Sequence, residues 1–314
     1  MCRRHPLTKW GLLLGALLTP AAVTGQEPAG KIIVLNTARS VDRYRLTEEE
    51  FRRQMGGQTI IDVNLEESDL DAAGLNDLIA REHPDLVYSI GSQAFHLAGA
   101  AAGGAPQLFS SVINWQRFPQ RAGVYGIANE LSLSQELSLL RYLLPKAVRV
   151  GVLFDPKFNR ERIAEAKAYS KDVGLTLVEK SIDNPVNDEV DDALLELLPQ
   201  IDILWLVSDP GILTDRDRVE GIFQAADEAG KPVYAYSEVF IGFGASLVAA
   251  PDIPTIGRQA ATLAQSLLRK EEPAAAVQFP AGSNIILDAC HLAKLNTEYN
   301  PDALDSVNRL LECH

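Results

Sequence analysis

The chain has 314 residues, 46% of them hydrophobic, and carries 42 acidic against 29 basic side chains. An acidic balance of this size repels nucleic acid and anionic membrane surfaces, so we expect neither as a partner. The length exceeds what one hydrophobic core usually supports, which predicts two domains.

The N-terminus has the layout of a secretory signal. Three basic side chains precede an apolar run over residues 10–18, and small residues follow at the places that signal peptidase recognises. We therefore expect residues 1–25 to be removed and the mature chain to reach the periplasm. The alternative is an uncleaved anchor helix, although this run is shorter than the roughly 20 residues that cross a bilayer. Removal takes away three basic residues and no acidic one, which leaves 26 against 42 and a balance of −16.

Two cysteines remain after the signal, Cys290 and Cys313, both near the C-terminus. In an exported protein they could form a disulfide that ties the C-terminal segment to its domain. Two unpaired buried thiols are the alternative, because the sequence gives no distance between them.

Short apolar runs alternate with longer amphipathic stretches along the chain. The expected strands lie at 31–35, 59–63, 86–90, 107–112, 149–154, 176–180, 203–207, 232–236 and 245–249. The expected helices lie at 47–55, 73–82, 132–144, 160–173, 189–198, 219–229 and 256–270. Near-continuous apolar strands between helices predict an α/β fold with parallel sheets covered on both faces. Because the pattern begins at residue 31 and begins again at 149, we expect two similar doubly wound lobes joined by a hinge.

Polar side chains follow the expected strands of the first half. Ser92 and Gln93 come directly after Gly91 and open a helix, an arrangement that suits an anion or carboxylate but also an ordinary helix cap. Ser110 and Ser111 end the fourth run, shortly before Trp115. Since ligands of open α/β sheets bind beyond the carboxyl ends of the strands, these residues are candidate ligand contacts.

In the second half, Asp155, Asp209 and the segment Tyr236-Ser237-Glu238 follow strands. Both aspartates precede proline, which is also typical of a turn. For Asp209 we favour a ligand contact with an ammonium group, because the opposite lobe offers groups that suit an anion. Asp155 is interpreted as a turn residue.

Catalytic, metal and cofactor signatures are absent from the sequence. The histidines at 83, 96, 291 and 314 lack metal-site spacing, and no phosphate loop, dinucleotide fingerprint or nucleophile elbow occurs. We therefore predict no enzyme activity, no metal site and no cofactor.

The residues also resemble a known family, the solute-binding proteins of ABC importers that include tryptophan- and tyrosine-binding members. The segments that carry the resemblance are 144–153, 230–234, 244–247, 256–260 and 289–295. The chain departs from the family at Ile113-Asn114-Trp115, where Asp-Pro often follows the strand, so the resemblance does not fix the solute.

The resemblance implies a type I periplasmic-binding-protein fold. It implies an N-terminal lobe of 31–128 plus about 249–276, and a C-terminal lobe of 129–248 plus about 277–314. The family's pocket would be formed here by Ser92, Gln93, Ser110, Ser111, Asp209, Tyr236, Ser237 and Glu238.

The function expected on these grounds is capture of a small polar solute, with amino-acid-like solutes among the candidates, by a monomer that delivers it to the membrane permease of an ABC importer. Ser92 and Gln93 would hold the anionic or carbonyl end of the solute, and Asp209 the cationic or hydroxyl end. Ligand would then favour the closed state of the two lobes. Two alternatives stay open: a sensor of the same fold that presents ligand to a membrane receptor, and an exported α/β enzyme.

Overall fold

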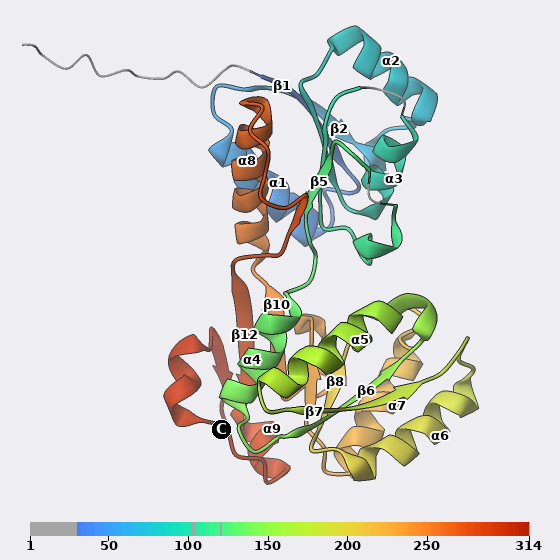
Figure 1. Ribbon diagram of the computed structural model, residues 1–314, viewed down its shortest axis with the longest axis vertical. Helices are drawn as coiled ribbons and strands as arrows, with labels where there is room; N and C mark the ends of the chain where they lie inside the picture. The colour runs from blue at the N-terminus through green and yellow to red at the C-terminus, as the bar shows by residue number, and fades with distance from the viewer. Residues whose placement is uncertain (1–29, 102–103, 120, 314) are drawn as a thin grey trace, which may run out of the picture.

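The computed structural model describes residues 30–101, 104–119 and 121–313, and the expected signal peptide lies outside them. Two α/β lobes stand one above the other (Figure 1), each built on its own sheet. The expected fold class, two lobes with parallel-sheet cores, is confirmed. None of the helices in the described ranges combines the length and apolar character needed to cross a bilayer.

The N-terminal lobe has a six-stranded parallel sheet in the order β11-β5-β4-β3-β1-β2. Its strands are β1 (Lys31–Asn36), β2 (Thr59–Asn64), β3 (Leu86–Ile90), β4 (Gln107–Ser110), β5 (Val124–Ile127) and β11 (Val277–Gln278). Its helices are α1 (Asp42–Gln54), α2 (Ala72–Glu82), α3 (Ser92–Ala100) and α8 (Ile253–Leu268), with the short 3-10 turns η1 (Leu65–Glu67) and η2 (Trp115–Arg117).

Both faces of this sheet are buried, as its unbroken apolar strands predict. In β1, Ile32 and Val34 join the core under α1 and α8, while Ile33 and Leu35 join the core on the other face. Helices α1 and α8 pack closely, because a Cβ atom at Gly257 of α8 would lie 2.4 Å from the carbonyl oxygen of Thr47 in α1.

The C-terminal lobe has a seven-stranded sheet in the order β13-β12-β10-β9-β8-β6-β7. Its strands are β6 (Arg149–Phe154), β7 (Thr176–Ser181), β8 (Ile203–Leu206), β9 (Val233–Ala235), β10 (Leu247–Pro251), β12 (Ser283–Asp288) and β13 (Arg309–Leu311). Its helices are α4 (Leu133–Leu143), α5 (Pro156–Asp172), α6 (Asn187–Leu197), α7 (Arg216–Glu228) and α9 (Ala289–Lys294), with 3-10 turns η3 (Leu198–Gln200), η4 (Glu238–Phe243) and η5 (Pro301–Ser306).

One pair of strands in this sheet is antiparallel, β10 with β12. The reason lies in the chain path: β10 leaves the lobe at Pro251 and β12 returns at Ser283, which is its register partner. Beyond β12, Cys290 of α9 forms a disulfide with Cys313, across a sequence separation of 23 residues. The alternative of two free thiols is therefore wrong for this structure.

Three crossovers join the lobes: from β5 to α4, from β10 to α8 and from β11 to β12. Backbone and side-chain hydrogen bonds connect them, among them Asp252 N to Gly282 O at 3.0 Å and Gln135 Nε2 to Pro280 O at 3.2 Å. Relative to the expected lobe boundaries, the second crossover lies three residues later, because β10 continues to Pro251. The third lies two residues later, because β11 ends at Gln278 and still belongs to the first sheet.

Four strands have no counterpart among the nine expected runs: β5, β11, β12 and β13. β11 and β13 have only two and three residues, and β5 is interrupted by Gly126. Such short or glycine-containing segments give little periodic signal, and pairing with neighbouring strands determines them.

Candidate functional site

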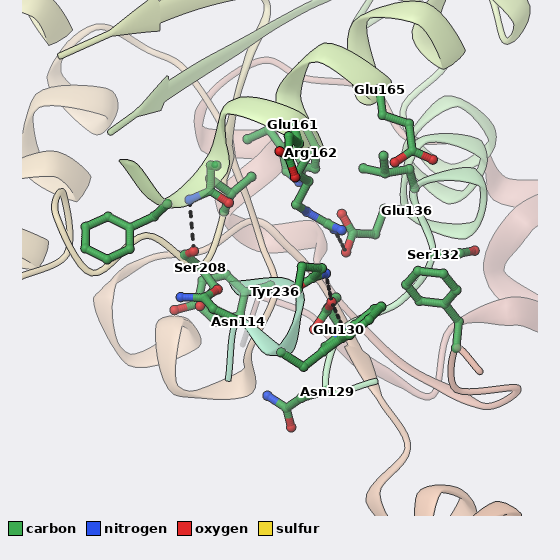
Figure 2. Close-up of a pocket in the computed structure, with 18 of the residues that line it drawn as sticks. Asn114, Asn129, Glu130, Ser132, Glu136, Glu161, Arg162, Glu165, Ser208 and Tyr236 are labelled. Atoms are coloured by element: carbon green, nitrogen blue, oxygen red, sulfur yellow. Dashed lines mark hydrogen bonds and ion pairs between the residues drawn. The ribbon is translucent and has the colours of Figure 1, made fainter. Parts of the chain in front are cut away.

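A cavity of about 1150 Å³ lies between the lobes, at the crossovers (Figure 2). The N-terminal lobe contributes residues 113–117, and the C-terminal lobe contributes the start of α4, residues along the whole of α5, the end of β8 and Tyr236. Asn129, Glu130, Pro251 and Phe279 line it from the three crossovers. A relative movement of the lobes therefore changes the shape of this cavity.

Local backbone geometry positions the loop over residues 113–117. The Ser92 hydroxyl accepts a hydrogen bond from the Ile113 backbone N–H at 3.2 Å. Asn114 then adopts a left-handed conformation with φ of 51°, which asparagine tolerates better than most residues, and η2 follows. From this turn the Arg117 guanidinium lies 4.7 Å from the centre of the Phe158 ring in α5, a contact between the lobes.

Glu130 stands in the first crossover, between β5 and α4. Its Oε1 atom accepts hydrogen bonds from Trp115 Nε1 at 2.8 Å and from the Gln116 amide. Burial raises the pKa of the Glu130 carboxyl, against the opposing charge of Arg162 and the hydrogen bonds from Gln116 and Trp115. The hinge therefore carries an acidic group that the N-terminal lobe contacts directly.

Glu136 lies in the first turn of α4, on the buried side of a helix that begins with a capping box of Ser132 and Gln135. Its Oε1 atom pairs with Arg162 of α5 at 2.8 Å, and the two side chains are 4% and 18% exposed. Burial raises the pKa of Glu136 to about 7; the charge of Glu130 adds to this, and Arg162 opposes it. At neutral pH such a carboxyl group is protonated in part of the molecules and charged in the rest.

Tyr236 and Ser208 complete the wall on the side of the C-terminal lobe. Burial raises the pKa of Tyr236, while its hydrogen bond with Ser208 and the charge of Arg43 in the N-terminal lobe oppose the shift. The Ser208 carbonyl oxygen accepts a hydrogen bond from Asn159 Nδ2 at 3.1 Å. Both lobes therefore bring aromatic and amide groups to the cavity, and the C-terminal lobe adds hydroxyl groups.

Of the eight residues expected from the sequence to contact ligand, only Tyr236 lines the cavity. In the N-terminal lobe, Ser92 anchors the loop just described and Gln93 is exposed at the start of α3. Ser110 is buried, and its hydroxyl shares a hydrogen bond of 2.6 Å with the Tyr88 hydroxyl. Ser111 is also buried, with φ of 57°, and no partner for its hydroxyl occurs in the part of the chain that the structure describes.

Asp209 is 2% exposed and lies outside the cavity wall. Four protein donors reach its carboxylate: the backbone N–H groups of residues 155, 211 and 212, and Asn159 Nδ2, all at 2.8–3.1 Å. Asp155 caps α5 by accepting from the Lys157 backbone N–H. The carboxylate of Asp209 therefore joins the loops after β6 and β8, and we assign it to the scaffold of the site.

The remaining two expected residues follow Tyr236. Ser237 is partly buried, and the Glu238 side chain is exposed. Glu238 pairs with Asn284 and, at 3.7 Å, with Arg309. These partners belong to β12 and β13, so Glu238 contacts the edge of its own sheet.

The interpretation of the sequence missed Glu130, Glu136 and Arg162. One signal could have identified Glu136, which falls on the same helical stripe as the buried Leu133, Leu137 and Leu140. A charged residue in the apolar stripe of an amphipathic helix is unusual, and it needs a partner when it is buried. Glu130 and Arg162 carry no comparable local pattern.

One arrangement resembles a catalytic triad but cannot act as one. His291 Nδ1 lies 3.0 Å from Ser246 Oγ, and His291 Nε2 lies 3.0 Å from Asp227 Oδ1. Ser246 is completely buried and lines no part of the cavity, so no substrate reaches its hydroxyl. Among the described residues no group of three or more histidine, cysteine, aspartate or glutamate side chains is placed to hold a metal ion.

Comparisons with known proteins agree with a binding cleft. The family model of the ABC transporter substrate binding protein matches residues 58–307. A tyrosine-binding protein of Clostridioides difficile (strain R20291) is 27% identical over 197 residues, which cover 59% of this chain and 54% of that protein. The aligned part thus spans about half the length of this curated relative.

Solved structures share the fold. The ligand-free, open structure of CD0873, a substrate binding protein with adhesive properties from Clostridium difficile, has a TM-score of 0.70 at 19% identity and covers 91% of this chain and 100% of its own. An ABC domain from Streptococcus pneumonia in complex with L-Trp has a TM-score of 0.60 at 17% identity, with 90% and 100% covered. The matched proteins bind substrates and are not enzymes. Because the family model matches most of its length, the chain belongs to the family of ABC transporter substrate binding proteins.

Proposed function

We propose that this chain is the extracytoplasmic solute-binding component of an ABC importer, and that it captures a small amino-acid-like solute between its lobes. The observation that carries the proposal is the cavity of about 1150 Å³ at the three crossovers, which both lobes line. A volume of this order holds a small organic molecule. The family match and the names of the relatives, which mention tyrosine and L-Trp, support the amino-acid class.

The solute is captured when the two lobes close around it. Residues 113–117 come from one lobe, while Tyr236 and the start of α5 come from the other. A solute between them makes all of its contacts only when the lobes approach, so it binds the closed state better and shifts the equilibrium toward it. The closed monomer is the state that the permease recognises.

The proposed site places the solute between the Trp115 loop and α5. In the N-terminal lobe, Ser92 supports the wall through its hydrogen bond with the Ile113 backbone N–H, and Ser110 and Ser111 precede the wall loop in the chain, while Gln93 stands exposed beside Ser92. Asp209 accepts a hydrogen bond from Asn159 and so ties the first turn of α5 to the loop that carries Ser208. We also propose that the mature chain begins near Gln26 and works in the periplasm, which N-terminal sequencing of the exported protein tests.

The capture proposal is tested by thermal-shift screening of the mature chain with the twenty amino acids, simple amines, organic acids and sugars, followed by calorimetry and small-angle scattering on any solute that stabilises it. We expect at least one amino-acid-like solute to bind and to lower the radius of gyration. Ser208→Phe fills the cavity wall and should abolish binding, whereas Ser68→Phe, on the exposed surface of the N-terminal lobe, should bind normally. Equal binding by wild type and Ser208→Phe would place the solute elsewhere.

The importer role needs a separate experiment. Cells that lack the chain should lose uptake of the solute identified in the screen. Wild-type protein should restore uptake and Ser208→Phe should not. Restored uptake with the filled cavity would contradict the proposed role.

A further inference from the structure

The charges of the innermost side chains of the cavity do not cancel. Glu130, Glu136 and Arg162 supply two carboxylates against one guanidinium, and Figure 2 shows the three converging beside Tyr236. The other charged residues of the wall are exposed to solvent: Arg117, Lys157, Arg160, Glu161, Glu165 and Asp172. Water screens these outer charges strongly, so one excess negative charge dominates the interior of the cleft.

Arg162, the cation of this inner set, forms its ion pair with Glu136 and acts on Glu130 through its charge. Arg162 Nη2 lies 2.8 Å from Glu136 Oε1, and the side chain of Glu136 is only 4% exposed. Glu130 accepts hydrogen bonds from two neutral donors, Trp115 Nε1 and the Gln116 amide. Neutral donors orient a carboxylate without cancelling its charge, so Glu130 has spare capacity for a cation.

The free-energy cost of two carboxylates with one guanidinium indicates a functional role for the excess acid. A carboxylate held away from water without a full counter-charge destabilises the folded chain, and such groups gather at functional sites. The charge of Glu130 raises the pKa of Glu136, which burial brings to about 7. Near neutral pH the acid pair therefore holds a proton for part of the time when no ligand is bound.

We propose that Glu130 and Glu136 form a subsite that receives a cationic group of the solute, an ammonium or a guanidinium, while Arg162 remains their resident counter-ion. This inference rests on the proposed function and narrows its ligand class to solutes that carry such a group. Trp115 and Tyr236 lie in the same wall and offer aromatic faces, which also attract cations. Simple sugars and purely anionic solutes are excluded.

The subsite couples the ligand charge to lobe movement. Glu130 belongs to the crossover, its donor Trp115 to the N-terminal lobe, and Glu136 with Arg162 to the C-terminal lobe. A cation bound to both acids therefore contacts each part that moves during closure. Removing the cationic group from the solute should weaken both binding and closure.

The cation and the proton compete for the same carboxylates. The charged or titratable groups facing them are Arg162 from α5 and Tyr234 from β9, whose hydroxyl donates to the Glu136 backbone oxygen; the outer charged residues named above are exposed. Within this set Glu136, with a pKa of about 7, loses its negative charge as the pH falls from 8 to 5.5, and burial raises the pKa of Glu130 as well. Affinity for a cationic solute should therefore fall about tenfold as the pH is lowered from 8 to 5.5.

The experiment uses calorimetry on the mature chain at pH 8 with matched probes. L-tyrosine and L-tryptophan retain both charged groups, tyramine and tryptamine retain only the ammonium, and 3-(4-hydroxyphenyl)propanoate and 3-indolepropionate retain only the carboxylate; L-lysine, L-arginine and putrescine extend the set of cations. We expect probes with an ammonium or guanidinium group to bind and the two propanoates to fail.

Two variants test the acids. Glu130→Gln and Glu136→Gln should each weaken the best cationic probe by roughly 30-fold or more and flatten its pH dependence. Glu228→Gln is the control, an exposed glutamate at the end of α7 that does not line the cavity. Circular dichroism checks folding; if Glu136→Gln unfolds because Arg162 loses its partner, Glu130→Gln decides alone.

The outcomes separate this inference from the proposed function. Tight binding of a solute without a cationic group, or wild-type affinity in a folded Glu130→Gln variant, overturns the subsite while capture in the cleft stands. No binding by any probe here or in the wider screen overturns both. Cation binding that depends on both acids and is unchanged in Glu228→Gln supports the subsite.

Discussion

Trp115 of the N-terminal lobe and Glu130 of the first crossover are joined by a hydrogen bond of 2.8 Å, from the indole Nε1 to the carboxylate Oε1. The bond connects a loop of the N-terminal lobe to the first crossover between the lobes. The Glu130 carboxylate therefore lies between the lobes, where both the charge of the proposed solute and the relative position of the lobes affect it.

Trp115→Phe removes this donor and keeps an aromatic ring. Because the indole N–H stabilises the charged form, the pKa of the Glu130 carboxyl should rise further in the variant. NMR titration of the carboxyl carbons in glutamate-labelled protein measures the change, with Glu130→Gln used to assign the signal. A Glu130 resonance that titrates identically in wild type and variant would contradict the hydrogen bond.

The stability of the chain should depend on pH through Glu136. Its pKa is about 7 in the folded state against an ordinary value of 4.5, so its contribution is fully present below pH 4.5 and is lost as the pH rises through 7. A shift of this size corresponds to about 3 kcal/mol of unfolding free energy. Urea unfolding between pH 4.5 and 8 should show a smaller loss in Glu136→Gln than in wild type. Parallel pH profiles of the two proteins would refute the assignment.

Asp209→Ala should act mainly on stability. It leaves four donors without their shared acceptor, including two buried groups at Asp155 and Asn159, and we expect a cost of about 3 kcal/mol or more. Asp155→Ala removes a helix cap from α5 and should cost about 1 kcal/mol. Urea unfolding of both variants gives the comparison. If Asp209→Ala lost ligand affinity at wild-type stability, Asp209 would be a ligand contact after all.

Gly257→Ala should destabilise the N-terminal lobe by about 1–3 kcal/mol, because the new Cβ would lie 2.4 Å from the carbonyl oxygen of Thr47 and push α8 away from α1. Gly221→Ala is the matched control in α7, where no atom lies within 4 Å of the added carbon. It should be neutral or slightly stabilising, since alanine favours a helix over glycine. Thermal melts that ranked the two variants in the reverse order would show that the helices have room to adjust.

Replacing both Cys290 and Cys313 by serine should lower the unfolding free energy by about 3 kcal/mol, because a loop of 23 residues regains its freedom in the unfolded chain. Thermal melts under oxidising conditions measure the loss. Dithiothreitol should lower the melting temperature of the wild type and leave the serine variant unchanged. Thiol titration of unfolded wild-type protein should find no free thiol, and two free thiols would exclude the bond in solution.

Local patterns in the sequence were sufficient to predict the two-lobed α/β architecture. Alternation between short apolar runs and amphipathic stretches reports burial on both faces of a parallel sheet, as Ile32, Ile33, Val34 and Leu35 show by joining alternate cores. The short strands β11 and β13 escaped this reading, because pairing with a neighbour from a distant part of the chain defines them.

The sequence by itself determined the fold class, the family and the pair of cysteines available for a disulfide, because each depends on residues that are close in the chain or on a repeated pattern. Only the tertiary structure decided which of the acidic residues line the candidate site. Asp209 and Glu130 both follow strands as acidic residues, yet protein donors saturate the first, while the second faces the cavity. The difference arises because the direction of a side chain beyond a strand depends on how loops from the two lobes pack, and this packing joins residues such as Trp115, Glu130 and Arg162 that no local pattern connects.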